Sequence, residues 1–317
     1  MRFEKRHLKE CVDIWNDAVR CEEVVFKPLT ENSFEGLFLS EKCNSVGVVK
    51  EEKGNVCGFA FGTVSESVGY ISFIGVKRSF RSKGIGRELY SELESIFLKE
   101  NPKINRIDCI FYNPCQIPWF IPNHFPHDHP GVPGVYMGSI GYQFLKNMGF
   151  FDYAIQNAYY MPLGYYVESE KVKERKNHLL SLGIEVCFFD KEKHFGFSEL
   201  FDNIKNDGWR KSVLSRLDEK IVVAVLDNKV IGYTGPLSVS REKRGLFCGI
   251  GVHTDYRNCG IGKVLFSELC LGLQDMGTEY MSLFTGENNP ARFVYETTGF
   301  ELVGKFSCMR KKIYKAD

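Results

Sequence analysis

The chain has 317 residues, so its length favours two domains of about 150 residues each. Its 41 Lys and Arg residues against 40 Asp and Glu leave a net charge of +1, which gives no electrostatic reason to expect a nucleic acid or an anionic membrane as partner. A small-molecule partner fits this balance better. The sequence has no apolar run near the roughly 20 residues of a membrane helix and no signal-peptide pattern at its start, so we expect a cytoplasmic protein.

The 11 cysteines are odd in number and are scattered through apolar, strand-like segments. A disulfide framework would place them in paired spacings. The pattern therefore predicts reduced, mostly buried thiols, as in a cytosolic protein.

The first half predicts a mixed α/β layer fold, because helical and strand-like periodicities alternate along it. The second helix has Ser33 as its expected N-cap. The predicted elements, in order, are a strand at 2–5, helices at 8–19 and 33–39, hairpin strands at 45–50 and 56–64, a strand at 70–76, a glycine-rich turn, a helix and a strand at 104–111.

The second half repeats this order. Its predicted elements are hairpin strands at 221–226 and 230–237, a strand at 246–252, a second glycine-rich turn, a helix and a strand at 280–284. Adding 176 maps Arg81 onto Arg257, and identities continue in that register into the helix. We infer a duplication, with domains at 1–164 and 185–317 joined by a charged linker helix at 165–184.

One long insertion interrupts the repeat. The Gly-Phe pairs at 149–150 and 299–300 are only 150 residues apart, so the first domain has 26 extra residues, at about 112–138. Their proline density forbids a regular helix or central strand and predicts an extended, ordered loop. This segment also holds His124, His127, Asp128 and His129. These side chains lack a regular ligand spacing, so we expect no metal and favour a lid or an inter-domain clamp over a metal site.

Both glycine-rich turns, at 81–86 and 257–262, lie between a buried strand and a helix. Glycines let the backbone approach an anion, the helix N-terminus offers free N–H groups, and the Arg adds positive charge. The expected occupant is a pyrophosphate. Neither turn is a Walker loop, and neither has the third glycine of a dinucleotide-binding fingerprint.

These residues resemble the Arg/Gln-x-x-Gly-x-Gly/Ala signature of the GCN5-related N-acetyltransferase (GNAT) superfamily, which binds the pyrophosphate of acetyl-CoA. A second pattern of that family matches Asn288, Ala291, Tyr295, Gly299 and Phe300. The resemblance covers both halves and is strongest over 246–300. It implies two tandem GNAT-like domains, each with a mostly antiparallel central sheet flanked by helices, similar in architecture to tandem members such as mycothiol synthase.

The resemblance also implies acetyl-CoA as cosubstrate, without a metal, and assigns residues to it. In the second domain these are Val252, Arg257, Asn258, Cys259, Gly260, Ile261, Gly262 and Asn288; in the first they are Val76, Arg81, Ser82, Lys83, Gly84, Ile85 and Gly86.

By the same resemblance Tyr295 lies near the thioester sulfur and acts as general acid. A thiol of pKa about 8.5 leaves more readily when it is protonated. The attacking amine must be neutral, so a base is useful, and His253 and Glu287 are the candidates. A main-chain N–H near Val252 is expected to stabilise the developing oxyanion.

The first domain departs from this pattern. Counting back from its Gly-Phe pair places Leu145 at the position of Tyr295 and Gly138 at that of Asn288. We therefore predict catalysis in the second domain, on a small-molecule primary amine such as an amino sugar, an amino acid derivative, a polyamine or an aminoglycoside. The alternatives are a non-catalytic acyl-CoA sensor or scaffold, and turnover in both domains. The sequence does not distinguish a monomer from a homodimer.

Overall fold

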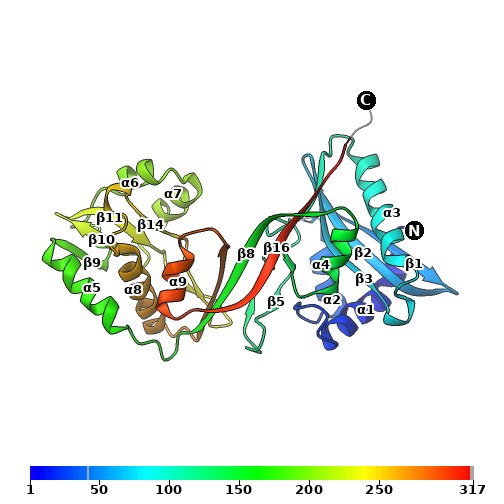
Figure 1. Cartoon of the computed structure of the whole chain (residues 1–317), viewed down its shortest axis with the longest axis horizontal. Helices are drawn as coiled ribbons and strands as arrows, with labels where there is room; N and C mark the ends of the chain where they lie inside the picture. The colour runs from blue at the N-terminus through cyan, green and yellow to red at the C-terminus, as the bar shows by residue number, and fades with distance from the viewer. Residues whose placement is uncertain (41–42, 315–317) are drawn as a thin grey trace. The chain divides into compact units, whose positions relative to one another are not determined.

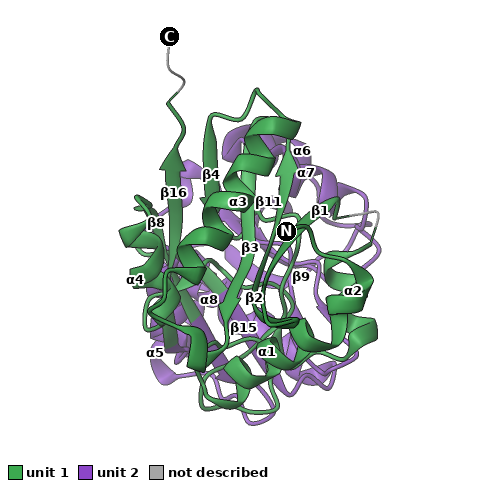
Figure 2. Ribbon diagram, turned by 90° about the vertical axis from the view of Figure 1, so that its right-hand side faces the viewer, with its two compact units in different colours: residues 1–158, 284–287, 303–317 green, residues 159–283, 288–302 purple. Residues whose placement is uncertain are grey.

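The structure, a computed structural model, describes residues 1–40 and 43–314. These residues form two compact units (Figure 2). Unit 1 contains residues 1–158 and 284–287 and the last strand from residue 303 onward, and unit 2 contains residues 159–283 and 288–302. Each unit is described by itself.

The first part of the chain builds most of unit 1. Its elements are α1 (Leu8–Arg20), α2 (Glu31–Phe38), β1 (Ser45–Glu52), β2 (Asn55–Ser65), β3 (Val68–Val76), α3 (Ile85–Glu100), β4 (Arg106–Cys109), β5 (Trp119–Phe120), β6 (Asp128–His129), β7 (Val135–Tyr136), α4 (Ile140–Asn147) and β8 (Phe151–Pro162) (Figure 1).

The later elements are α5 (Glu170–Ser181), β9 (Ile184–Phe188), α6 (Phe197–Ile204), α7 (Asp207–Leu214), β10 (Val222–Leu226), β11 (Lys229–Thr234), β12 (Ser238–Val239), β13 (Gly245–Leu246), β14 (Ile250–Val252), α8 (Ile261–Asp275), β15 (Tyr280–Gly286), α9 (Arg292–Thr298) and β16 (Glu301–Lys312). None of the helices in the described residues has both the length and the apolar character that crossing a membrane requires.

The sheet of unit 1 separates two apolar layers. Strands β1, β2 and β3 are antiparallel neighbours, and β4 continues the sheet in parallel with β3. Side chains alternate along β2, so Phe59 and Phe61 pack on α1 and α2, whereas Ala60 faces α3 and α4. An irregularity in the pairing with β1 leaves Cys57 as an extra residue and places it on the same side as Ala60. The glycine-rich turn after β3 therefore joins a central strand to a covering helix.

The last strand of the chain completes the sheet of unit 1. In β16, Met309 is paired with Cys109 of β4, and the antiparallel register continues to Lys312 opposite Arg106. Strand β7 pairs with the same strand, Phe306 lying opposite Tyr136. Side chains from the far end of the sequence thus fill the core of this unit, where Met309 is fully buried.

Unit 2 repeats the layered arrangement around an antiparallel sheet of order β14-β11-β10-β9. Helices α5, α8 and α9 cover the face that carries Val222, Ala224 and Ile231. Helices α6 and α7 cover the opposite face. The segment expected as a linker contains α5, whose buried Val172 and Leu179 belong to the core of unit 2.

Most predicted elements of both halves are present, in the expected order, and the fold class is confirmed. Three local predictions were wrong. The second helix begins at Glu31, because Thr30 rather than Ser33 accepts the capping hydrogen bond. Residues 2–5 form no strand, only a bridge from Arg2 to Val48. The run 246–252 is interrupted between β13 and β14. The domain limits 1–164 and 185–317 remain a prediction.

Candidate coenzyme and acetyl-transfer sites

The two glycine-rich turns have nearly the same backbone geometry. In unit 1, Ser82 and Gly84 have φ of 61° and 85°; in unit 2, Asn258 and Gly260 have φ of 64° and 84°. Gly84 and Gly260 are the N-caps of α3 and α8, and neither helix start has a side-chain cap. The first N–H groups of each helix are thus left for an anion, as a pyrophosphate cradle requires.

The arginine of each glycine-rich motif also stabilises its turn through a hydrogen bond to the backbone. The Nε of Arg81 donates to the carbonyl oxygen of Val76 at 3.0 Å, and the Nε of Arg257 donates to that of Val252 at 3.1 Å. The guanidinium of Arg81 makes a further bidentate pair with Glu23, at 2.8 and 2.6 Å. Among the described residues no ion pair is made by Arg257, which is exposed. The two cradles therefore differ in charge.

The strands that lead into and follow each turn diverge. In unit 1 the parallel pairing of β3 with β4 ends at Tyr70 opposite Asp108, which leaves the edge of β3 open beyond that point. Ser72 forms a bulge against β2 just after the pairing ends. Asn113, which follows β4, spans the opening: its Nδ2 donates to the carbonyl of Ile71 at 3.0 Å. In unit 2, β14 and β15 share no ladder, and only a bridge joins Arg244 to Tyr280.

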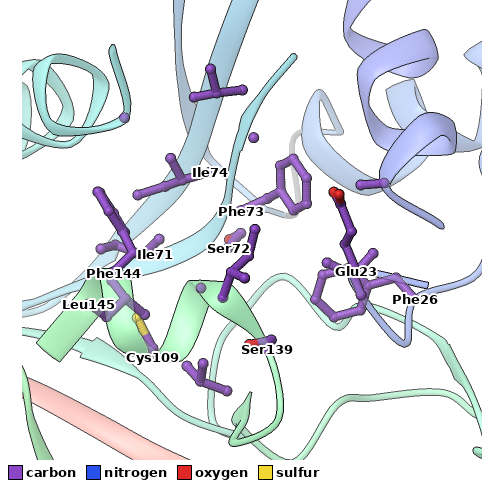
Figure 3. Close-up of a pocket in the computed structure, with 18 of the residues that line it drawn as sticks. Glu23, Phe26, Ile71, Ser72, Phe73, Ile74, Cys109, Ser139, Phe144 and Leu145 are labelled. Atoms are coloured by element: carbon purple, nitrogen blue, oxygen red, sulfur yellow. The ribbon is translucent and has the colours of Figure 1, made fainter. Parts of the chain in front are cut away.

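A cavity of about 490 Å³ lies along the open edge of β3, entirely within unit 1 (Figure 3). Its wall includes most of the first glycine-rich turn, from Arg81 to Gly86 apart from Lys83. Phe144 and Leu145 of α4 lie on one side of it, and Phe26 and Phe73 lie on the other. The cavity thus connects the phosphate cradle with the helix α1 side of the sheet.

Two matching regions identify the chain. The acetyltransferase (GNAT) family matches residues 11–114 and again residues 185–300, together more than half of the sequence. The chain belongs to the GNAT family of acetyltransferases. It is therefore an N-acetyltransferase, and enzymes of this family take the acetyl group from acetyl-CoA and transfer it to an amine.

Similar proteins agree with this assignment. Over 114 residues, 36% of this chain and 69% of the other protein, the sequence is 32% identical to the ribosomal protein bS18-alanine N-acetyltransferase of Haemophilus influenzae. The chain also shares its fold with a tandem GNAT protein from the clavulanic acid biosynthesis pathway, at a TM-score of 0.54 and 15% identity over 98% of this chain and 97% of that one.

The glucosamine N-acetyltransferase region of a fungal multi-domain GH3 β-N-acetylglucosaminidase gives a TM-score of 0.65 at 16% identity over 98% of this chain. This GNAT chain spans 38% of the length of that fungal protein. The likeness shows a common fold, and the family match over two separate regions confirms the expected tandem GNAT architecture.

Tyr295, the expected acid, lies on α9 in the core of unit 2 and is only 6% exposed. Its ring centroid is 4.9 Å from that of Phe266 and 5.9 Å from that of Tyr159. Burial raises the pKa of Tyr295 to about 12, with a smaller contribution from Tyr159. The hydroxyl therefore stays protonated at neutral pH and can donate a hydrogen bond.

The other sequence-predicted residues are more scattered. Asn288 is exposed and precedes α9 in unit 2. The Nδ1 of His253 accepts from the backbone N–H of Asp255 at 3.3 Å, so this side chain caps the short turn before the glycines. Glu287 belongs to unit 1, where it pairs with Lys305 at 2.5 Å. The structure thus puts Tyr295, Asn288 and His253 in one unit and Glu287 in the other.

Helix α4 of unit 1 has no tyrosine in the position of Tyr295. Leu145 is buried there and contacts the cavity. Tyr142, one turn earlier, donates its hydroxyl to Asp152 at 3.1 Å and is not part of the cavity wall. Ser139, the N-cap of α4, contributes to the wall, but its hydroxyl donates to the carbonyl of Tyr136 at 2.7 Å.

Sequence reasoning missed Asn113 and Arg175. Asn113 was missed because the two halves were aligned by counting back from their Gly-Phe pairs. The 176-residue offset that aligns the glycine-rich turns instead places Asn113 one residue from Asn288. Arg175 of α5, in a segment expected to be a plain solvated face, lies against the second cradle. A Cβ at Gly260 would come within 2.8 Å of its Cδ. Its guanidinium places a positive charge beside this turn.

The proline-rich insert is extended and ordered, as predicted, with only the two-residue strands β5, β6 and β7. Its β5 region pairs with residues 25–27, since Phe120 N–H donates to the carbonyl of Val25 at 2.9 Å and Lys27 N–H to that of Pro118 at 3.1 Å. Nowhere in residues 1–40 and 43–314 do three His, Cys, Asp or Glu side chains gather as a metal site would require. The insert instead forms part of the cavity wall.

Proposed function

We propose that this GNAT enzyme acetylates the primary amine of a small molecule, by direct attack of the neutral amine on acetyl-CoA, and that unit 2 carries the general acid. The acceptor classes are those expected from the sequence: amino sugars, amino acid derivatives, polyamines or aminoglycoside-like amines. The observation that carries the proposal is the pair of uncapped helix starts at α3 and α8, each preceded by a strand with an open edge.

The chemistry needs little beyond positioning. The coenzyme pyrophosphate occupies the cradle at residues 257–262, where Arg175 and Arg257 supply positive charge. The amine nitrogen attacks the thioester carbonyl and forms the C–N bond, the C–S bond breaks, and the nitrogen loses a proton to a base or to water. The leaving thiolate takes up one proton, so that coenzyme A is released as the free thiol. Holding the two reactants together supplies most of the rate. Glu287 and His253 remain the candidate bases, and each has a local partner already.

Tyr295 acts as a hydrogen-bond donor to the leaving sulfur. With a pKa of about 12 against about 8.5 for a thiol, complete proton transfer from Tyr295 before C–S cleavage is uphill. A hydrogen bond that strengthens as negative charge develops avoids this cost. Tyr295→Phe keeps the ring packing and removes only the donor.

The test is release of free thiol from acetyl-CoA over an amine panel that includes glucosamine, spermidine, an aminoglycoside and a peptide with N-terminal alanine. We expect release with at least one of these, and Tyr295→Phe lowers kcat about 100-fold, the low end of what general acids contribute. Tyr142→Phe is the matched control, because it makes the same chemical change on the equivalent helix of unit 1. Coenzyme binding without thiol release would favour a sensor. Unchanged turnover in Tyr295→Phe would remove this residue from the mechanism.

A further inference from the structure

Unit 1 has a second cavity, of about 330 Å³, bounded by β3, β4, β8, β16 and the residues just after β4. Ile110 is the only described residue that lines both this cavity and the larger one, so the glycine-rich turn is not part of the second cavity. The proposed function does not use this space. Six side chains in its wall are aromatic or cationic: Tyr70, Arg106, Phe111, Tyr112, Tyr153 and Arg310.

The charge of the second cavity is set by two arginines and one carboxylate. Tyr70, Asp108 and Arg310 lie in register on three neighbouring strands and share one face of the sheet. Asp108 is fully buried and accepts two hydrogen bonds of 2.8 Å from Arg310 and one of 3.2 Å from Arg106. The charge of the exposed Glu66 also reaches Tyr70, but no acidic side chain among the described residues lines the cavity. Two positive charges against the one of Asp108 leave a net charge of +1.

Of the two arginines, Arg106 has hydrogen-bond donors to spare. Its Nε donates to Asp108, whereas its Nη1 and Nη2 have no hydrogen-bond partner in the part of the chain that the structure describes. The guanidinium of Arg310 is instead held between Asp108 and the Tyr153 ring, whose centre lies 3.9 Å away. A planar fork with free N–H groups matches the two oxygens of a carboxylate. Arg310 therefore orders the cavity, and Arg106 is free to bind an anion.

Aromatic rings line much of the rest of the cavity. Tyr112 and Tyr153 are 69% and 58% exposed, and the centroid of the Phe111 ring lies 3.9 Å from that of Tyr112. Such rings offer flat apolar surface against which another ring can pack. Burial raises the pKa of Tyr70, so its hydroxyl stays protonated and can donate a hydrogen bond.

These features select one class of ligand. The net positive charge repels an ammonium group, so the acceptor amine does not belong here. A phosphate monoester has a charge of about −1.5 to −2, whereas a carboxylate has the single charge that balances +1. The volume lies at the low end of small-molecule sites, which suits one or two fused rings. We propose that the second cavity binds a planar aromatic carboxylate, with its carboxylate on the free N–H groups of Arg106 and its ring among the tyrosines.

The experiment is calorimetric titration of the full chain, saturated with coenzyme A, with indole-3-carboxylate. Three further probes each lack one feature: indole-3-carboxamide has no charge, cyclohexanecarboxylate has no aromatic ring, and tryptamine has an ammonium group instead of the anion. Arg106→Gln removes the free guanidinium. Arg2→Gln is the matched control, because it makes the same change at a half-exposed arginine outside the cavity. Tyr112→Leu removes an exposed ring and leaves the Asp108 hydrogen bonds intact, and it decides the question if Arg106→Gln does not fold.

We expect indole-3-carboxylate to bind the native chain and Arg2→Gln equally. Binding should be at least about tenfold weaker in Arg106→Gln, which loses charge-assisted hydrogen bonds, and about threefold weaker in Tyr112→Leu. Circular dichroism and an unchanged affinity for coenzyme A check that each variant folds. Absence of binding to the native chain, equal binding of any of the three other probes, or unchanged affinity in either cavity variant overturns the proposal. Thiol release is not measured, so the result does not depend on the proposed function.

Discussion

The carboxylate of Glu23 makes the first cradle pH-sensitive. Hydrogen bonds from Arg81, assisted by Arg78, hold the pKa of Glu23 below its usual value although burial opposes this. A carboxylate with a lowered folded-state pKa contributes stability that is complete above its unfolded-state pKa, about 4.3, and is lost as the pH falls through the lower value. Glu23→Gln should therefore destabilise unit 1 by about 1 kcal/mol at pH 7 and by less at pH 3.

Amide exchange of β3 at both pH values measures this difference. Glu199→Gln, an exposed carboxylate in the first turn of α6, is the control and should change neither value. An equal loss of protection at pH 7 and pH 3 in Glu23→Gln would mean that packing, not charge, makes the contribution.

Single residues of the cradles were predictable because their conformations are local. Gly84 and Gly260 adopt positive φ at a strand-to-helix turn. A few adjacent residues are enough to recognise such a turn in the sequence. Asn113 was not found, because its partner Ile71 lies 42 residues earlier and the insert shifts the register of the residues after it. The packing of Arg175 on Gly260 depends on tertiary structure, so the sequence of the charged segment around Arg175 does not indicate this contact.

At the level of elements, the pairing of β16 with β4 encloses a buried ion pair. Asp108 is fully buried and accepts two hydrogen bonds of 2.8 Å from Arg310, whose guanidinium also lies 3.9 Å from the centre of the Tyr153 ring. Asp108 also contacts the Nε of Arg106, at 3.2 Å. Removing Arg310 leaves the buried carboxylate with this longer contact alone, so the cost approaches the roughly 3 kcal/mol of breaking a buried pair.

Arg310→Met should therefore lower the free energy of unfolding of unit 1 by about 3 kcal/mol, measured by native-state amide exchange at β4. Arg2→Met is the control, because Arg2 pairs with Glu100 at a half-exposed site worth less than about 1 kcal/mol. Similar losses in the two variants would show that the Asp108 pair adds nothing beyond an ordinary surface contact.

Helices and strands that follow from local periodicity were predicted well. Strand pairings between segments far apart in the sequence were not. The hairpin of β1 and β2 follows from alternation around a polar turn. The proline content of the insert predicts an extended chain, but it does not reveal that β5 joins residues 25–27, since pairing partners are chosen by the folded structure. The insert was expected to act as a lid or an inter-domain clamp, but for the same reason the sequence did not predict which of its residues line the cavity.

At the scale of the whole molecule, the sequence repeat and the compact units do not divide the chain in the same way. The repeat predicts a cut near residue 164, whereas the last strand, from residue 303 onward, belongs to unit 1. The sequence pattern of β16 does not show whether this strand joins the sheet of the second half, to which it belongs in the sequence, or the sheet of the first half. A fragment ending at residue 164 would expose the edge of β4 and lose the buried side chains of Phe306, Cys308 and Met309.

Residues 1–164 alone should therefore fold poorly, and a synthetic peptide of residues 303–314 should restore their structure. The peptide would restore the four residue pairs with β4. It would also restore the hydrogen bonds from Arg310 to Asp108 and the core contacts of Met309. Far-UV circular dichroism and amide exchange at β4 follow the recovery as the peptide is added. A peptide with Met309→Asp and Arg310→Glu is the control, since it places charge in the core and reverses the ion pair. Full native protection in the fragment without peptide would show that unit 1 folds independently of the last strand.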